Sequence, residues 1–327
     1  MEFLAYTVVT FFGVLFSLKK FPIKNPKLFF VIWFSVYFAL VIIVRTNFQG
    51  DIIQYVKVMD YTSLSIFFIR EPVVWLGQRY LFALTESAYI VFVIFDIILG
   101  IFLFKALKNF NLPQFAFFSI LILFPFVLGM QTAYRQWVAN IILLYSFSLM
   151  WSEQKTFKTY IFFALSFLSH NVIAVFFPIL LVRNQKGLGE LAWLISFTIS
   201  LIGIYIAAET KSVANTGLDL SLIYLLILSF FFCLIFILDK GVIRKIRKQE
   251  YKIFLSLLII VFFAYLLLSS AYIERISMIC LIILYPILIN LVEERFRQKE
   301  IIRIIFTIFG FMPMFLVSPQ VSRFIFE

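Results

Sequence analysis

The chain has 327 residues, of which 63% are hydrophobic and 14% charged, and its formal net charge is +11. A soluble domain carries closer to half apolar residues, so a water-soluble enzyme or binding module is excluded. The mean hydropathy of +1.05 and repeated apolar runs of about 16 to 20 residues predict helices that cross a bilayer. We expect an all-α polytopic membrane protein that forms a single integral membrane domain over residues 1–327.

The excess of positive charge does not indicate a nucleic-acid partner. The basic residues form short clusters between apolar runs, which is the pattern that sets the orientation of a membrane protein. Cys233 and Cys280 each lie inside an apolar run, so we interpret them as small buried hydrophobes. No Gly-rich phosphate loop, metal-binding motif or serine nucleophile motif occurs, so we expect no metal and no cofactor.

Taken in order, about ten apolar ranges are expected to form full transmembrane helices. These are residues 3–18, 28–44, 88–104, 114–131, 137–151, 190–208, 220–238, 253–271, 277–292 and 301–317. A further apolar stretch at 159–182 has the single histidine of the chain, His170, at its centre.

The distribution of lysine and arginine predicts an unusual course for residues 159–182. With the N-terminus outside, the basic clusters that follow the first, third and fifth spans are cytoplasmic. The most basic loop, residues 239–252, falls on the same side only if the chain enters and leaves 159–182 on one side. We therefore predict a short helical hairpin around residue 170, whose halves are each too short to span, and a C-terminus outside.

Between the second and third spans, residues 45–86 concentrate charge in an otherwise apolar chain. This segment is expected to be an outer interfacial or re-entrant loop, with Trp75 and Tyr80 as interfacial anchors. From Arg45 to Arg79, the charged residues of this segment are Arg45, Asp51, Lys57, Asp60, Arg70, Glu71 and Arg79.

Within this loop, two residues are predicted to lie at helix starts. Asp51 follows Gly50 and precedes an apolar run, so it is either an N-cap or a substrate contact, and Tyr55 would share its helical face. Glu71 precedes Pro72, which disfavours helix at Glu71 and allows a new helix to begin at Pro72. Arg70 and Arg79 are compatible with contacts to lipid headgroups or to substrate.

Three outside positions elsewhere could carry chemistry. Arg135 lies between two spans and either reaches lipid headgroups or grips a phosphate with its planar guanidinium. His170, beside Asn171, is either a hydrogen-bonded core histidine or a general base. Arg275 precedes a late span and either pairs with Glu274 or contacts substrate.

Read together, these residues resemble the pattern of the EpsG family over roughly residues 45–290. The matching positions are Arg45, Gly50-Asp51, Tyr55, Glu71-Pro72, Tyr134-Arg135-Gln136 with Ala139, Ala164, Phe167 and His170 with Pro178, and Arg275. The chain departs from the pattern where Met59 replaces the usual aromatic residue and Val73 replaces the glycine after Pro72. Both departures concern the shape of the acceptor groove.

The EpsG family consists of bacterial exopolysaccharide, capsule or O-antigen repeat-unit polymerases of the Wzy type. The resemblance implies glycosyl transfer at the outer face of the cytoplasmic membrane, from a glycan on undecaprenyl diphosphate to a lipid-linked repeat unit. No metal is implied, because the lipid diphosphate is itself the leaving group. Membrane lipid, a chain-length regulator and a flippase are the implied partners.

The resemblance and the residue chemistry together suggest roles for twelve positions. The catalytic candidates are Arg135, for the departing diphosphate, and His170, Asp51 and Glu71, for the proton of the acceptor hydroxyl. The candidates for substrate binding are Arg45, Tyr55, Arg70, Arg79, Tyr134, Gln136, Asn171 and Arg275.

Three rival functions use the same residues. A related glycan ligase would share the arginines and the lipid-diphosphate donor. A permease or flippase for a lipid-linked sugar would line a path with the same polar side chains. A membrane acyltransferase would employ His170 with Asn171.

Overall fold

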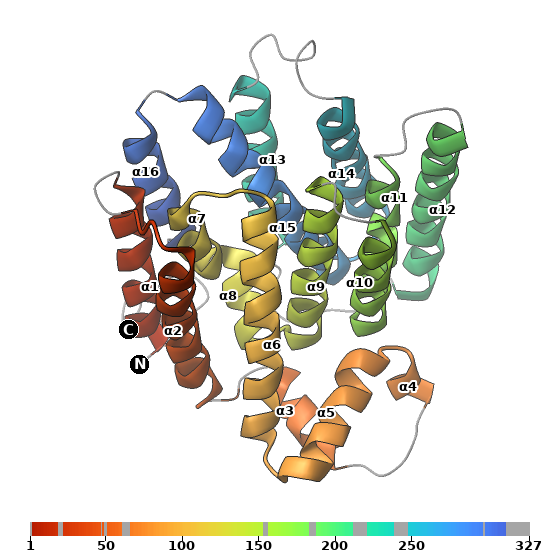
Figure 1. Cartoon of the computed structure of the whole chain (residues 1–327). Coiled ribbons are helices and arrows are strands. Elements are labelled where there is room, and N and C mark those ends of the chain that lie inside the picture. Colours follow the sequence, from red (N-terminus) through yellow and green to blue (C-terminus); the bar gives the residue numbers. More distant parts are fainter. Residues whose placement is uncertain are drawn as a thin grey trace, which may run out of the picture.

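The computed structural model describes residues 2–18, 22–46, 48, 51–60, 66–152, 156–182, 188–211, 221–238, 248–296 and 298–311. Within these ranges every regular element is a helix, which confirms the predicted all-α class. Figure 1 shows the helices packed into a bundle, with three short helices (α3, α4 and α5) gathered at one end of it.

The helices in the first half of the chain are α1 (Glu2–Ser17), α2 (Pro26–Arg45), α3 (Asp51–Met59), α4 (Ile66–Ile69), α5 (Pro72–Thr85), α6 (Ala88–Asn109), α7 (Gln114–Ser119), the 3-10 helix η1 (Ile120–Ile122), α8 (Phe124–Gln131) and α9 (Tyr134–Trp151). Those in the second half are α10 (Thr156–Ser169), the 3-10 helix η2 (Asn171–Phe176), α11 (Phe177–Leu181), α12 (Leu188–Lys211), α13 (Ser221–Leu238), α14 (Lys248–Leu267), α15 (Ser270–Arg295) and α16 (Lys299–Phe311).

Four of the described helices, α2, α6, α12 and α15, are long and apolar enough to cross a membrane. A fifth span results if Gln114–Ile122 (α7 with η1) and Phe124–Gln131 (α8) are taken together, although these two pieces are bent by 54°. Each of the ten predicted apolar ranges contains a helix, but the remaining helices are shorter or less apolar. The prediction of about ten full spans is therefore not confirmed, whereas several apolar helices indicate a multi-pass membrane protein.

The bend between η1 and α8 follows from local sequence. Leu123 is extended, with φ −62° and ψ 134°, and Pro125 lies in the first turn of α8. A proline is tolerated there because the first amides of a helix have no intrahelical acceptor in any case. The chain is thus free to change direction before α8 and α9.

Packing differs strongly across the bundle. In α15, 83% of an apolar stretch of 18 residues is buried, whereas in α12 the buried share of such a stretch is 17%. The exposed apolar side chains of α12, among them Ile195, Ile199 and Ile202, are suited to contact lipid. Hence α15 is a central helix and α12 a peripheral one.

The segment α3–α5, which was expected to be an outer interfacial or re-entrant loop, is more closely packed than such a loop. Trp75, expected to be an interfacial anchor, is instead buried, with its ring 5.2 Å from that of Tyr55 and 5.4 Å from that of Phe68. Tyr80, the other expected anchor, is 70% exposed. The burial of Trp75 arises because α5 turns this face toward the bundle.

Candidate functional site

Two serine hydrogen bonds determine how α9 and α10 face each other. Ser146 Oγ donates to the carbonyl of Thr159, and Ser166 Oγ donates to the carbonyl of Ala139, each at 2.7 Å. Seven residues separate the two contacts on both helices, so the helices run antiparallel in a constant register. Four residues before Ala139 in α9 and four residues after Ser166 in α10, the same register brings Arg135 level with His170. Small polar side chains permit this close approach.

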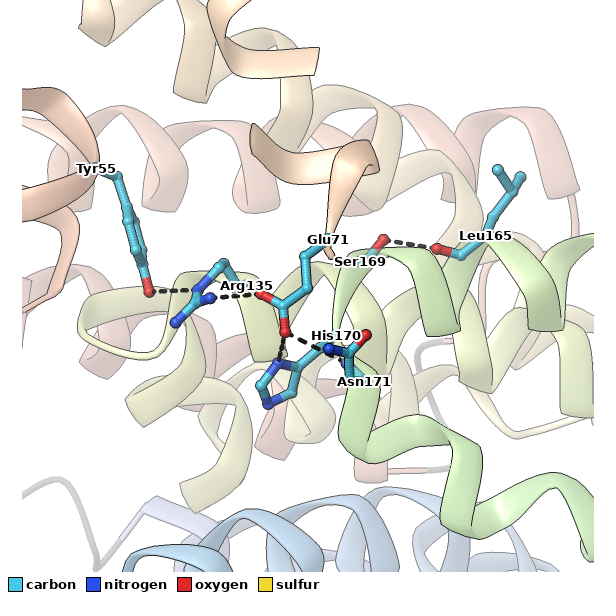
Figure 2. Close-up of polar contacts among 7 residues, drawn as sticks. All are labelled: Tyr55, Glu71, Arg135, Leu165, Ser169, His170 and Asn171. Atoms are coloured by element: carbon cyan, nitrogen blue, oxygen red, sulfur yellow. Dashed lines mark hydrogen bonds and ion pairs between the residues drawn. The ribbon is translucent and has the colours of Figure 1, made fainter. Parts of the chain in front are cut away.

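His170 lies where helix α10 is interrupted. Its backbone is extended, with φ −158° and ψ 119°, and it separates α10 from η2. The break predicted at this residue is therefore present, and it leaves two helical pieces, each shorter than a span. The interruption places the imidazole beside Glu71, which precedes α5 (Figure 2).

Glu71 immediately precedes α5, as predicted from the proline that follows it. It occupies the N-cap position, but its side chain makes no capping hydrogen bond. Pro72 has no amide hydrogen to be capped, which removes one local partner for the carboxylate. The carboxylate is thus directed away from its own helix and into the bundle.

The carboxylate of Glu71 joins two candidate residues from different helices (Figure 2). Oε2 accepts from Arg135 Nη1 at 2.5 Å, and Oε1 lies 2.8 Å from His170 Nδ1. The backbone amide of Asn171 also donates to Oε1, at 3.3 Å. We call Glu71, Arg135 and His170 the Glu71 cluster.

The partner of Nδ1 defines the state of the imidazole. A carboxylate only accepts, so Nδ1 carries the hydrogen in the neutral ring and the lone pair lies on Nε2. Nε2 is buried and has no hydrogen-bond partner among the described residues. The ring is therefore oriented to accept a proton at Nε2.

The pKa values of the cluster agree with this assignment. Both groups lie outside the helices that are long enough to span a membrane. Burial alone would raise the pKa of Glu71, but hydrogen bonding and charge from His170 and Arg135 lower it to about 2. Burial lowers the pKa of His170, and the positive charges of Arg275 and Arg135 add to this effect against the opposing effect of Glu71. At neutral pH the cluster holds a carboxylate, a guanidinium and an uncharged imidazole.

Arg135 is the most accessible member of the cluster. Its Nε donates to the hydroxyl of Tyr55 at 3.2 Å, and its guanidinium carbon lies 5.1 Å from the ring centre of Trp75. The side chain is 21% exposed, and in the described part of the chain its Nη2 atom makes no hydrogen bond. An anion could therefore bind Arg135 without complete loss of its present contacts.

Arg275 and Gln136 complete the surroundings of His170. Gln136 Nε2 donates to the backbone carbonyl of Arg275 at 2.8 Å, which attaches the first turn of α9 to α15. The Arg275 guanidinium carbon lies 5.4 Å from the ring centre of Tyr272. Since its charge lowers the pKa of His170, Arg275 provides a second positive group in the surroundings of the Glu71 cluster.

Other predicted residues lie outside the Glu71 cluster. Asp51 begins α3 as expected, but its side chain is outside the described atoms. Arg70 is exposed. Arg79 contacts α3 and α4: its Nε donates to the Val58 carbonyl at 3.4 Å, and its guanidinium carbon lies 3.9 Å from the ring centre of Phe68. Asn171 contributes its backbone amide, while its side chain is exposed.

Arg45 and Tyr134, both expected to bind substrate, are fully buried and contact Asp96 instead. Arg45 Nε lies 2.7 Å from Asp96 Oδ2, and the Tyr134 hydroxyl donates to Oδ1 at 3.1 Å. Both residues are at most 1% exposed and bound to Asp96, so a direct contact with substrate stays a prediction for them. Asp96 was missed, although an acidic residue within the apolar run of α6 is a signal in its own right.

Chemically, the site combines a proton acceptor with positive charge. Among the described residues, no group of three or more His, Cys, Asp and Glu side chains could hold a metal ion. The Nε2 atom of His170 can take a proton from a hydroxyl, and Arg135 with Arg275 can stabilise a developing anion nearby.

Comparison with known proteins gives one match. The model of the EpsG family matches residues 27–326, which include every member of the Glu71 cluster. No curated protein and no solved structure matches the chain.

Proposed function

Since the chain belongs to the EpsG family of Wzy-type polymerases, we propose that it joins lipid-linked oligosaccharide repeat units by glycosyl transfer. The donor is a growing glycan on undecaprenyl diphosphate, and the acceptor is a single lipid-linked repeat unit. The observation that carries this proposal is the Glu71 cluster, in which a neutral imidazole and a partly accessible arginine share one carboxylate.

In the proposed reaction, a hydroxyl oxygen of the acceptor sugar attacks the anomeric carbon of the donor. The bond from that carbon to the diphosphate oxygen breaks, and undecaprenyl diphosphate leaves. The hydroxyl proton passes to His170 Nε2, whose Nδ1–H is held by Glu71. General base assistance of this kind contributes roughly 10²- to 10⁴-fold to the rate.

Arg135 and Arg275 have a separate role in the proposal. Negative charge accumulates on the diphosphate as the bond breaks, and guanidinium groups bind phosphate oxygens in bidentate fashion. Arg135 is held by Tyr55 and Glu71, so the charge is in place before the reaction begins. Because arginine supplies the positive charge, activity is expected to persist in EDTA.

We further propose that the site faces outward from the bacterial cytoplasmic membrane. Figure 1 shows α6 running from the end that holds α3–α5 to the opposite end of the bundle. Lys105 and Lys108 lie at that opposite end, in the last turns of α6. Basic residues favour the cytoplasmic side, so the Glu71 cluster would lie outside.

The test uses purified protein in lipid and a lipid-linked repeat unit, with glycan ladders as the readout. The His170→Ala and Arg135→Ala variants are each expected to lose chain extension by at least about 100-fold. Ser169→Ala is the matched control, because Ser169 neighbours His170 but, within the described part of the chain, its hydroxyl donates to the carbonyl of Leu165 and not to the Glu71 cluster.

Wild-type ladder lengths in either cluster variant would contradict the assigned roles. Ladders absent from the wild type, together with movement of the lipid-linked sugar across the bilayer, would show a permease or flippase instead. Transfer of finished glycan to a different acceptor, without ladder growth, would show the related ligase.

A further inference from the structure

A buried ion pair lies apart from the Glu71 cluster, between two candidate spans. Arg45 of α2 and Asp96 of α6 are 2.7 Å apart, and both side chains are 0% exposed. Burying two charges is costly, and replacing such a pair with apolar groups often leaves stability unchanged or higher. Stability alone is therefore a poor account of this pair.

The remaining polar atoms of the pair reach across the break between α8 and α9. Arg45 Nη1 donates to the carbonyl of Met130 at 2.8 Å, and Asp96 Oδ1 accepts from the Tyr134 hydroxyl at 3.1 Å. Met130 lies in the last turn of α8, where carbonyls lack intrahelical donors. Tyr134 is the first residue of α9. The pair therefore holds both sides of the break.

The Arg45 guanidinium also packs on aromatic rings. Its carbon lies 4.7 Å from the ring centre of Tyr134 and 5.4 Å from that of Phe92. The face of an aromatic ring attracts a cation, and the attraction is stronger where water is excluded. Tyr134 is thus held by its ring as well as by its hydroxyl.

The first three residues of α9 are attached to three different parts of the molecule. Tyr134 is bound to Asp96 of α6, Arg135 to Glu71 before α5, and Gln136 to the Arg275 carbonyl of α15. An incoming anion would compete for Arg135, which is 21% exposed, but cannot reach the Asp96 contact, which is fully buried.

We propose that Asp96 and Arg45, acting through Tyr134, are positioning residues that hold Arg135 where it receives the lipid diphosphate. The identity of that anion rests on the proposed function, whereas the placement of Arg135 does not. A displacement of about 1 Å at a substrate-binding group can reduce turnover by roughly 100-fold.

Two tyrosines provide a matched pair of variants. Tyr134 and Tyr37 are both 0% exposed, and both donate to Asp96. Tyr134 binds the carboxylate, whereas Tyr37 binds the backbone carbonyl at 2.8 Å. Tyr134→Phe is expected to lower kcat/KM for the donor at least 10-fold, and Tyr37→Phe is expected to lower it by less than about 2-fold, at comparable melting temperatures.

A spectroscopic readout separates positioning from activity. Trp75 lies 5.1 Å from the Arg135 guanidinium carbon, so its fluorescence reports on Arg135. Its emission is obtained by subtracting the spectrum of the same variant carrying Trp75→Phe. We expect a changed Trp75 emission in Tyr134→Phe and an unchanged emission in Tyr37→Phe.

Equal behaviour of the two tyrosine variants in both readouts would overturn the positioning role. If the wild type forms no glycan ladder but Trp75 emission still changes only in Tyr134→Phe, the proposed function fails while the positioning role stands.

A double variant addresses loss of folding. Arg45→Met with Asp96→Leu replaces the pair with apolar side chains and leaves no unpaired charge. It is expected to retain the melting temperature of the wild type within a few degrees and to lose at least about 10-fold in turnover. Full turnover in a folded double variant would disprove the proposal.

Discussion

At Glu71, one carboxylate binds an imidazole through one oxygen and a guanidinium through the other. This makes the residue a link between the proton acceptor and the positive charge of the site. Glu71 itself is not expected to accept the proton, because a carboxyl group with a pKa of about 2 is a weak base at neutral pH. His170 is therefore the better candidate for the base.

The pH dependence of polymerisation tests this assignment. A general base acts when deprotonated, so activity should rise as pH increases through the pKa of His170 and then remain constant. Since burial lowers this pKa below its ordinary value of about 6.5, the acidic limb should fall below pH 6.5. Initial rates of ladder formation between roughly pH 4.5 and 8 measure it, and a limb above the ordinary value would exclude the assignment.

Replacing Glu71 with glutamine should shift that limb in a defined direction. Contact with Glu71 raises the pKa of His170, so removing the negative charge should move the limb to still lower pH. The maximal rate should also fall by roughly 100-fold, because Arg135 loses its fixed partner. An acidic limb that stays at the wild-type pH would show that Glu71 and His170 are not coupled during catalysis.

At the scale of helices, α2 and α6 depend on a close contact at Gly100. A Cβ atom at this position would overlap the ring of Tyr37, whose hydroxyl donates to the carbonyl of Asp96. Small residues allow helices in a membrane to approach closely. The ring of Tyr37 therefore packs directly on the backbone of α6, which requires glycine at position 100.

Gly100→Ala is accordingly expected to destabilise the protein by about 1–3 kcal/mol through overpacking. Gly203→Ala in α12 is the matched control, since a Cβ there meets no atom within 4 Å. The control should be neutral or stabilising by up to about 1 kcal/mol, because alanine favours helix. Thermal unfolding in detergent compares the two, and equal melting temperatures would contradict the close contact.

Local sequence predicts several of these elements well. Pro72 allows a helix to begin directly after Glu71. The interruption at His170 was expected from the distribution of basic residues among the loops, and the structure has it. The bend before α8 was not predicted. The apolar range 114–131 is long enough to span a membrane, and Pro125 is the residue within it that is compatible with a break.

For the whole molecule, the charge pattern predicts that both ends of residues 159–182 lie on one side of the membrane. The break at His170 is consistent with a chain that turns back, because neither helical piece is long enough to cross. The Glu71 cluster would then face the opposite side from the basic loops.

A reporter fused after Lys186 tests this topology. It is expected to be cytoplasmic, as is a control fusion after Lys108. A fusion within residues 212–220 should be external. An external reporter after Lys186 would mean that 159–182 crosses the membrane once, and the predicted hairpin would be wrong.

The amino-acid sequence alone predicts the class of protein, the helix start at Pro72, the interruption at His170 and the residues that could carry chemistry. The class follows from composition, the helix start from local backbone preferences at Pro72, and the interruption from the distribution of basic residues along the chain. The resemblance to EpsG proteins was also visible in the sequence, and the family match over residues 27–326 confirms it.

Which of these residues meet depends on how the helices pack, and this could not be predicted from the sequence. A helix that is apolar on all sides has little periodicity to show which face it turns to a neighbour. The register of α9 against α10 brings Arg135 to the level of His170. The position of α5 in the fold places Glu71, the residue before this helix, between them. The same packing buries Arg45 against Asp96, because the pairing of two charges in apolar surroundings depends on helix contacts that lie far apart in the chain.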